Sequence, residues 1–269
     1  MAVLAGIVAQ ILEDKLGHIG PFQGAIFLTV VALILILPWE ENYGEVSEDN
    51  QSSLYTQFKE GWKATFTDSR IWRIGLTQAM SEGAMYTFVF MWVPTLLNLA
   101  PDGIVPTGCV FSSLMMAITM GGILFPILHD FITKFVVSES KSSELTASFV
   151  YSLAAISMGV SSLCLASKYD ISYKFELVLA SFVVMELCVG LFNPVAGTLR
   201  SKYVPDGLQG GILNIFRLPL NAVVVGGTYA TDILPSSQVF AIVSACFFTA
   251  SIVQASLMFA HKDRKVKLH

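Results

Sequence analysis

The sequence predicts an all-α integral membrane protein, on the evidence of its composition and of its long apolar stretches. Charged residues make up only 13% of the 269 residues and apolar residues 54%, whereas about 25% of the residues of a soluble domain are charged. This number of charged residues is too small to cover the surface of a soluble protein of this length. The mean hydropathy of +0.65 and repeated apolar runs of about 20 residues, the length that a bilayer requires, indicate several membrane spans.

The same composition excludes several functional classes. The net charge is −4 and no basic tract with interleaved aromatic residues occurs, so nucleic acid is not an expected partner. No motif of a hydrolase, a metalloprotease or a nucleotide-binding loop is present, and we therefore expect neither an enzyme nor a bound cofactor. The cysteines lie inside apolar runs without metal-ligand or disulfide spacing, so no metal site is expected; they are Cys109, Cys164, Cys188 and Cys246.

Seven apolar stretches are long enough to cross the bilayer as helices. They cover residues 20–38, 71–98, 107–128, 147–167, 175–199, 209–231 and 238–260. Residues 1–12 are also apolar but too short to cross alone. A secretory signal would begin with a positive charge, whereas the first cation is Lys15. We therefore interpret residues 1–12 as the end of a span whose beginning is missing.

The basic residues predict the orientation of these spans, because cytosolic loops carry an excess of Lys and Arg. If segment 39–70 is cytosolic, 12 of the 16 Lys and Arg residues fall on the cytosolic side and three on the other, while Arg217 lies inside a span. The cytosolic group includes Arg200 and Lys202, which follow the span 175–199. We expect both segment 39–70 and the tail 261–269 to be cytosolic.

Segment 39–70 begins as an acidic stretch and ends as a predicted amphipathic helix. Leu54, Phe58, Trp62 and Phe66 recur every four residues, a spacing that places them on one helical face. Such a helix is expected to lie flat on the inner membrane surface. The alternative is a partly ordered linker with accidental spacing. Asp68, shortly before the next span, is expected to cap its N-terminus.

Ionisable side chains inside the spans mark the candidate site, because a charge in the bilayer centre costs at least about 2.5–3.5 kcal/mol. Three such residues occur, and each belongs to a stripe of polar or small residues on one helical face. The stripes are Gln78, Glu82 and Tyr86; Glu186, Gly190, Asn193 and Gly197; and Gly210, Asn214, Arg217, Asn221 and Thr228.

We interpret the three stripes as a central site for a small anion. At a rise of ~1.5 Å per residue, Arg217, Glu82 and Glu186 lie ~12, ~16 and ~20 Å from the cytosolic ends of their spans. Arg217 is expected to contact an oxyanion through its planar fork, and Glu82 and Glu186 are expected to orient it or carry a coupling proton. Neutral donors would come from Asn214, Asn221, Gln78 and Asn193.

Simpler interpretations of these residues stay open. Glu82 and Arg217 would then form a structural ion pair, and Asn193 and Asn221 would bond across helices. The glycines of the stripes, including Gly190, would only permit close packing of helices. Proline residues interrupt four spans, as in transporter helices that bend around a site; they are Pro94, Pro126, Pro194 and Pro219.

Several local strings resemble one family of the major facilitator superfamily, the molybdate-anion transporters. The strings are PWEENYG (38–44), DSRIWRIGLTQAMSEGAMYTFVFMWVP (68–94), ELCVGLFNPVAGTLRSKYVP (186–205) and GILNIFRLPLN (211–221). The resemblance implies a fold of twelve spans in two six-helix bundles. It assigns 1–38 to a remnant of the N-terminal bundle, 39–70 to the cytosolic central loop, 71–260 to the C-terminal bundle and 261–269 to a cytosolic tail.

The resemblance also implies a function, transmembrane transport of molybdate by alternating access, which we expect at the plasma membrane. The expected partners are molybdate or a similar oxyanion, the lipid bilayer, and the missing N-terminal half. The alternatives are transport of another solute, such as a sugar or organic anion, and a truncated membrane isoform that does not transport. The loop signature of the superfamily is degenerate, because only Gly122, Asp130 and Lys134 match it.

Overall fold

The computed structural model describes residues 2–39, 54–100, 103–136, 139–167 and 173–259. The acidic part of the predicted central loop (40–53) and the predicted tail (261–269) lie outside the described residues. The helices are α1 (Ala2–Leu16), α2 (Gly20–Ile36), α3 (Leu54–Thr67), α4 (Ser69–Leu99), α5 (Thr107–Phe135), α6 (Glu139–Ala166), α7 (Lys174–Tyr203), α8 (Gln209–Ile233) and α9 (Ser236–Leu257), with a short 3₁₀ helix at Asp206–Leu208.

The described residues form an all-α membrane protein, as the sequence predicts. The five helices from α5 to α9 are long and apolar enough to cross a membrane. Helix α4, at 31 residues, is also long enough, but its polar stripe makes it less apolar than these five. Only helices occur here because a helix satisfies all its backbone hydrogen bonds internally, which the bilayer interior requires.

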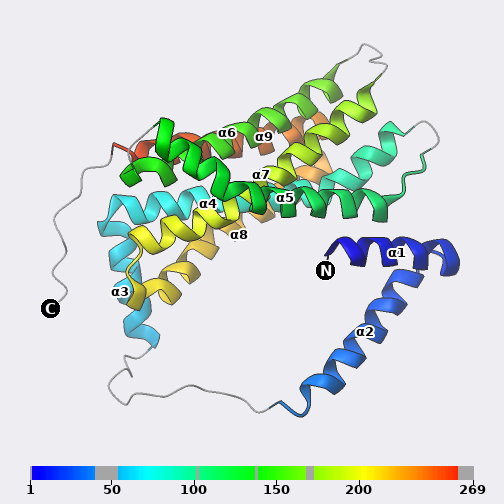
Figure 1. Cartoon of the computed structure of the whole chain (residues 1–269), viewed down its shortest axis with the longest axis horizontal. Coiled ribbons are helices and arrows are strands. Elements are labelled where there is room, and N and C mark those ends of the chain that lie inside the picture. Colours follow the sequence, from blue (N-terminus) through cyan, green and yellow to red (C-terminus); the bar gives the residue numbers. More distant parts are fainter. Residues whose placement is uncertain (1, 40–53, 101–102, 137–138, 168–172, 260–269) are drawn as a thin grey trace.

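Helices α4 to α9 pack side by side as one bundle, whereas α1 and α2 lie at its edge (Figure 1). Within the bundle, α6 packs against α9 and α7, α7 packs against α5, and α4 packs against α8 and α9. Helix α1 contacts α5, and α2 contacts α1. In Figure 1, α2 runs away from the bundle, and α3 lies beside α4 and α8.

The core of the bundle is aromatic and lies where α4, α6, α7 and α9 meet. Phe88 of α4 and Phe182 of α7 are fully buried, and their rings meet edge to face with centroids 5.0 Å apart. Phe240 of α9 packs on the other side of Phe182 at 5.2 Å. These rings supply the van der Waals contacts that hold helices together in a bilayer.

Serine hydroxyls join α6 to α9 along the length of both helices. Ser251 Oγ lies 3.0 Å from Ser148 Oγ and 2.7 Å from Ser152 Oγ. Further along, Ser244 Oγ donates to the carbonyl oxygen of Ala155 at 2.7 Å, and Ser162 Oγ donates to that of Ser237 at 2.7 Å. Hydrogen bonds between membrane helices contribute about 0.6 kcal/mol each on average, so the seam adds to the stability of this pair.

Helices α5 and α7 approach each other closely at two glycines. A Cβ atom on Gly190 would overlap the carbonyl oxygen of Ile118, and one on Gly121 would overlap that of Leu187. The packing interpretation therefore holds for Gly190. It does not hold for Gly197 or Gly210, because nothing lies within 4 Å of a Cβ built at either position.

Helix α3 occupies the part of segment 39–70 in which the sequence predicts an amphipathic helix. Gly61 and Thr65 are buried, and Gly61 packs on Ile212 of α8. The opposite face exposes Phe58, Trp62 and Phe66, whose neighbouring ring centroids lie 6.2 and 4.8 Å apart. A small-residue face thus contacts the protein, while the aromatic face is free to contact the membrane surface.

Asp68 caps α4, also as predicted, by accepting a hydrogen bond from the backbone N–H of Arg70 at 2.9 Å. The Arg70 guanidinium bonds the same carboxylate at 2.9 Å. Partial burial raises the pKa of Asp68, but these hydrogen bonds and the charge of Arg70 outweigh it, so that the pKa lies below its ordinary value. The cap therefore stays ionised at neutral pH.

Helices α4, α6 and α8 begin at the same end of the bundle at which α5, α7 and α9 end (Figure 1). Most of the described cations lie at this end. One of these cations, Lys202 of α7, is paired with a buried carboxylate of α6. Its Nζ lies 2.6 Å from Glu144 Oε1, and Tyr203 donates its hydroxyl to the same oxygen. Because Glu144 is only 1% exposed, these two partners offset the cost of burying its charge.

Gly190→Ala is expected to destabilise the protein by about 1–3 kcal/mol, the usual cost of overpacking, because the added methyl group would force α5 and α7 apart. Thermal unfolding of the purified chain in detergent measures the effect. Gly197→Ala is the matched control, since its methyl group meets open space. Equal losses of stability in the two variants would contradict the packing argument.

The orientation of the bundle gives a second prediction. An epitope tag inserted at Asn50 is expected to bind antibody only after the cells are permeabilised, because the basic end of the bundle should face the cytosol. A tag at Gly103, between α4 and α5, belongs to the opposite end and should bind antibody on intact cells. Antibody binding at Asn50 on intact cells would show that the predicted orientation is wrong.

Candidate functional site

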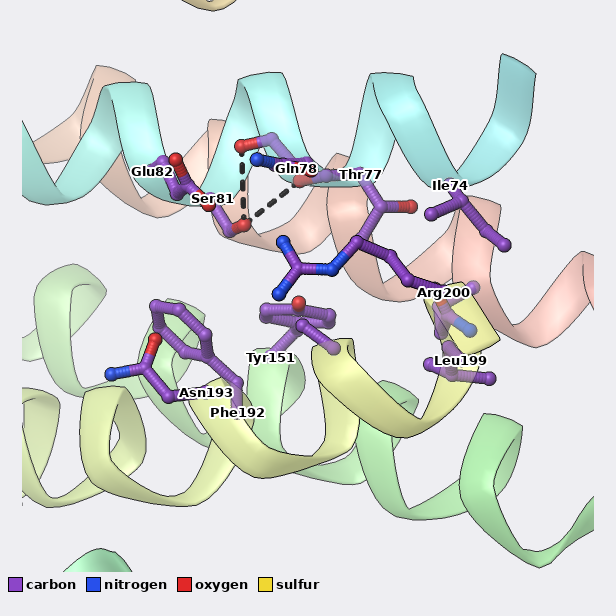
Figure 2. Close-up of a pocket in the computed structure, with 12 residues that line it drawn as sticks. Ile74, Thr77, Gln78, Ser81, Glu82, Tyr151, Phe192, Asn193, Leu199 and Arg200 are labelled. Atoms are coloured by element: carbon purple, nitrogen blue, oxygen red, sulfur yellow. Dashed lines mark hydrogen bonds between the residues drawn. The ribbon is translucent and has the colours of Figure 1, made fainter. Parts of the chain in front are cut away.

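Residues from four helices of the bundle line a small cavity of about 40 Å³. Three of the predicted site residues contribute to it, Gln78 and Glu82 from α4 and Asn193 from α7. Tyr151 of α6 (Figure 2) and Gln254 of α9 also line the cavity. The i, i+4 spacing of Gln78 and Glu82 places both on the α4 face that meets α7.

Arg200 of α7 supplies the positive charge of this cavity. The sequence assigns Arg200 to a cytosolic connection, but α7 continues to Tyr203, so Arg200 lies in its last turn. Its guanidinium reaches inward between Ser81 and Tyr151 (Figure 2). Within the described part of the chain, no carboxylate lies within 4 Å of this guanidinium.

Several polar atoms that line the cavity have no hydrogen-bond partner among the described residues. They are Thr77 Oγ1, Gln78 Oε1 and Gln254 Nε2. Thr77 is 3% exposed and Gln254 only 1%, and an unsatisfied buried group of this kind costs about 1–3 kcal/mol. The neighbouring hydroxyl of Ser81 is satisfied, because it donates to the carbonyl oxygen of Thr77 at 2.8 Å. The cavity is therefore built to receive water or a polar ligand.

Glu82 connects the cavity to the predicted stripe of α8. Glu82 and Arg200 both line the cavity, and the charges of Arg200 and Arg217 both act on the Glu82 carboxylate. No ion pair within 4 Å joins Glu82 to Arg217 in the described residues. The structure thus brings the two residues into electrostatic range without the direct pair that the simpler interpretation requires.

The α8 stripe itself lies outside the cavity. Phe216 and Val223 of α8 pack next to Gly75 and Gly83 of α4. The predicted residues Asn214, Arg217 and Asn221 lie on the other side of α8 and are exposed. They form one continuous polar face on a helix whose remaining surface is largely apolar, and we call these three residues the α8 polar face.

The structure does not bring Glu186 to the cavity or to the α8 polar face. Glu186 is 4% exposed and lies on α7 one turn from Gly190, on the face that packs against α5. The candidate site therefore has two parts, the cavity and the α8 polar face, with Glu82 between them. The residues that the sequence interpretation missed are Thr77, Tyr151, Arg200 and Gln254, none of which belongs to the predicted stripes.

The chain matches the model of a family described as sugar transporters with twelve transmembrane spans over residues 1–187. No solved structure matches the chain. The family description agrees with the helical membrane fold.

Proteins named molybdate-anion transporters are also similar to the chain. The protein of Xenopus laevis is 31% identical over 227 residues, covering 82% of this chain and 46% of its own length. That of Takifugu rubripes is 26% identical over 253 residues, covering 86% and 50%. The chain thus spans about half the length of the curated relatives it matches. The matches and the fold together show that this chain belongs to the molybdate-anion transporter family of the major facilitator superfamily.

Proposed function

We propose that the chain takes part in transmembrane transport of molybdate or a similar tetrahedral oxyanion. The observation that carries the proposal is the exposed α8 polar face, where Arg217 stands between Asn214 and Asn221. A guanidinium donates two parallel hydrogen bonds to an oxyanion, and the two amides add neutral donors. The names of the relatives support molybdate as the solute.

The main alternative is transport of a sugar, because the matching family model is described as one of sugar transporters. A sugar is neutral and needs no cation at its binding site, and a cation in a membrane span is costly. The three charged residues of the candidate site are two arginines and Glu82, which leaves one positive charge. This balance favours an anion over a sugar.

The proposed transport unit follows the division expected from the sequence. Residues 71–260 form the C-terminal bundle and 39–70 the cytosolic loop, while residues 1–38 belong to the N-terminal bundle. Transport would proceed by rocking of two bundles around a site between them. The position of α1 and α2 at the edge of the bundle α4 to α9 in Figure 1 supports this division. The proposed location is the plasma membrane, which biotinylation of surface proteins on intact cells would test.

Binding to the purified chain in lipid nanodiscs tests the solute directly. Titration calorimetry is expected to detect binding of molybdate and of tungstate, which has the same shape and charge, and no binding of glucose. Saturable binding of glucose without binding of molybdate would overturn the proposal. Accumulation of molybdenum in cells that express the chain together with the spans of an N-terminal bundle then tests transport itself, because the proposed rocking needs two bundles.

Arg217→Lys is expected to weaken molybdate binding by roughly 10-fold or more, because an ammonium group keeps the charge but cannot reproduce the paired hydrogen bonds of the fork. Thermal unfolding should be unchanged, since Arg217 is exposed. Arg73→Lys is the matched control, because Arg73 bonds only the carbonyl oxygen of Ser256 among the described residues, at 3.2 Å. Unchanged affinity in Arg217→Lys would remove Arg217 from the site.

A further inference from the structure

The cavity in Figure 2 lies apart from the α8 polar face and has its own cation. Arg200 is three residues from the end of α7, ~4.5 Å along the helix axis, and its side chain turns inward from there. Arg217 is eight residues from the start of α8, ~12 Å along that axis. Both distances are measured from the same end of the bundle. The cavity therefore lies nearer than the α8 polar face to the end that we predict to be cytosolic.

The cavity presents hydrogen-bond donors from three different helices. The Arg200 guanidinium comes from α7, the Thr77 hydroxyl from α4 and the Gln254 amide nitrogen from α9. The Thr77 and Gln254 atoms are without a partner in the described residues although both side chains are more than nine-tenths buried. Donors from three helices around one cavity fit a ligand with acceptor oxygens on several sides, as a tetrahedral oxyanion has.

The size of the cavity fits a small ion. Its volume is about 40 Å³, whereas a single water needs about 10–15 Å³ measured in the same way. The cavity is thus large enough for a cluster of a few oxygen atoms and too small for a sugar ring. The lining also holds the Glu82 carboxylate and the acceptor Gln78 Oε1, so the charge that would attract an anion comes from Arg200.

We propose that this cavity is a second oxyanion-binding position, in which Arg200 holds the ion by two parallel hydrogen bonds and Gln254 and Thr77 donate to its remaining oxygens. The ligand class follows from the proposed function, on which this inference rests. An ion bound at Arg217 would pass through the Arg200 position on its way to or from the cytosol, with Glu82 between the two arginines.

The number of binding sites tests this proposal. Titration calorimetry of the purified chain in nanodiscs is expected to give two molybdate ions per chain. Arg200→Gln should weaken one of the two sites by roughly 10- to 100-fold, the loss expected for a charged hydrogen-bonding partner, and should leave the other intact. Arg217→Gln should do the reverse. Sulfate and phosphate as competitors identify which tetrahedral oxyanion the cavity prefers.

Two further variants separate binding from folding. Arg73→Gln removes an arginine at the same end of the bundle that does not line the cavity, and it is expected to keep both sites. Gln254→Leu removes one cavity donor at similar volume and should weaken the same site as Arg200→Gln, which keeps the test valid if Arg200→Gln fails to fold.

The failures of the two proposals are distinguishable. One molybdate per chain, lost in Arg217→Gln but unaffected by Arg200→Gln and Gln254→Leu, would overturn the second position and leave the proposed function standing. Absence of molybdate binding to the unmodified chain would overturn both.

Discussion

Hydrocarbon offers no hydrogen-bonding partner, and this constraint decides where the polar side chains of the bundle lie. A polar group within a span must bond to its own helix, bond to a neighbouring helix or face a polar cavity. Ser251 meets the requirement at the α6–α9 seam, where two serines of α6 lie within 3.0 Å of its hydroxyl. Glu144 meets it through Lys202 and Tyr203 at the basic end of the bundle.

Three of the five buried side-chain polar atoms that have no partner among the described residues line the cavity. Thr77 and Gln254 contribute unpartnered atoms to the cavity, and Arg200 points into it without an acidic partner within 4 Å in the described residues. The other two unpartnered atoms are Thr95 Oγ1 and Glu144 Oε2, which lie outside the cavity. Binding of a polar ligand in the cavity would remove the energetic cost of the unpartnered atoms that line it. Most of the unpartnered atoms are thus at the cavity, whereas Glu186 is buried outside it.

The sequence predicts the helices well because their signals are local. Span lengths, the four-residue spacing of Phe58, Trp62 and Phe66 and the cap at Asp68 each depend on a few consecutive residues. The cavity depends on which faces of α4, α6, α7 and α9 meet, and a single polar residue such as Gln254 carries no periodic signal of that meeting. Arg200 was missed for a further reason: counting it as a cytosolic cation is reasonable at the end of a span, but a long side chain in a last helical turn can also point inward.

The charges of Glu82, Arg200 and Arg217 bear on which solute the proposed site would attract. Glu82 alone beside Arg217 would be a neutral pair, typical of a structural bridge between helices. Arg200 changes this balance, because it lines the same cavity as Glu82. Two cations then accompany one carboxylate in the proposed site. A neutral solute would gain nothing from this excess of positive charge, whereas a divalent oxyanion would be attracted at both arginines.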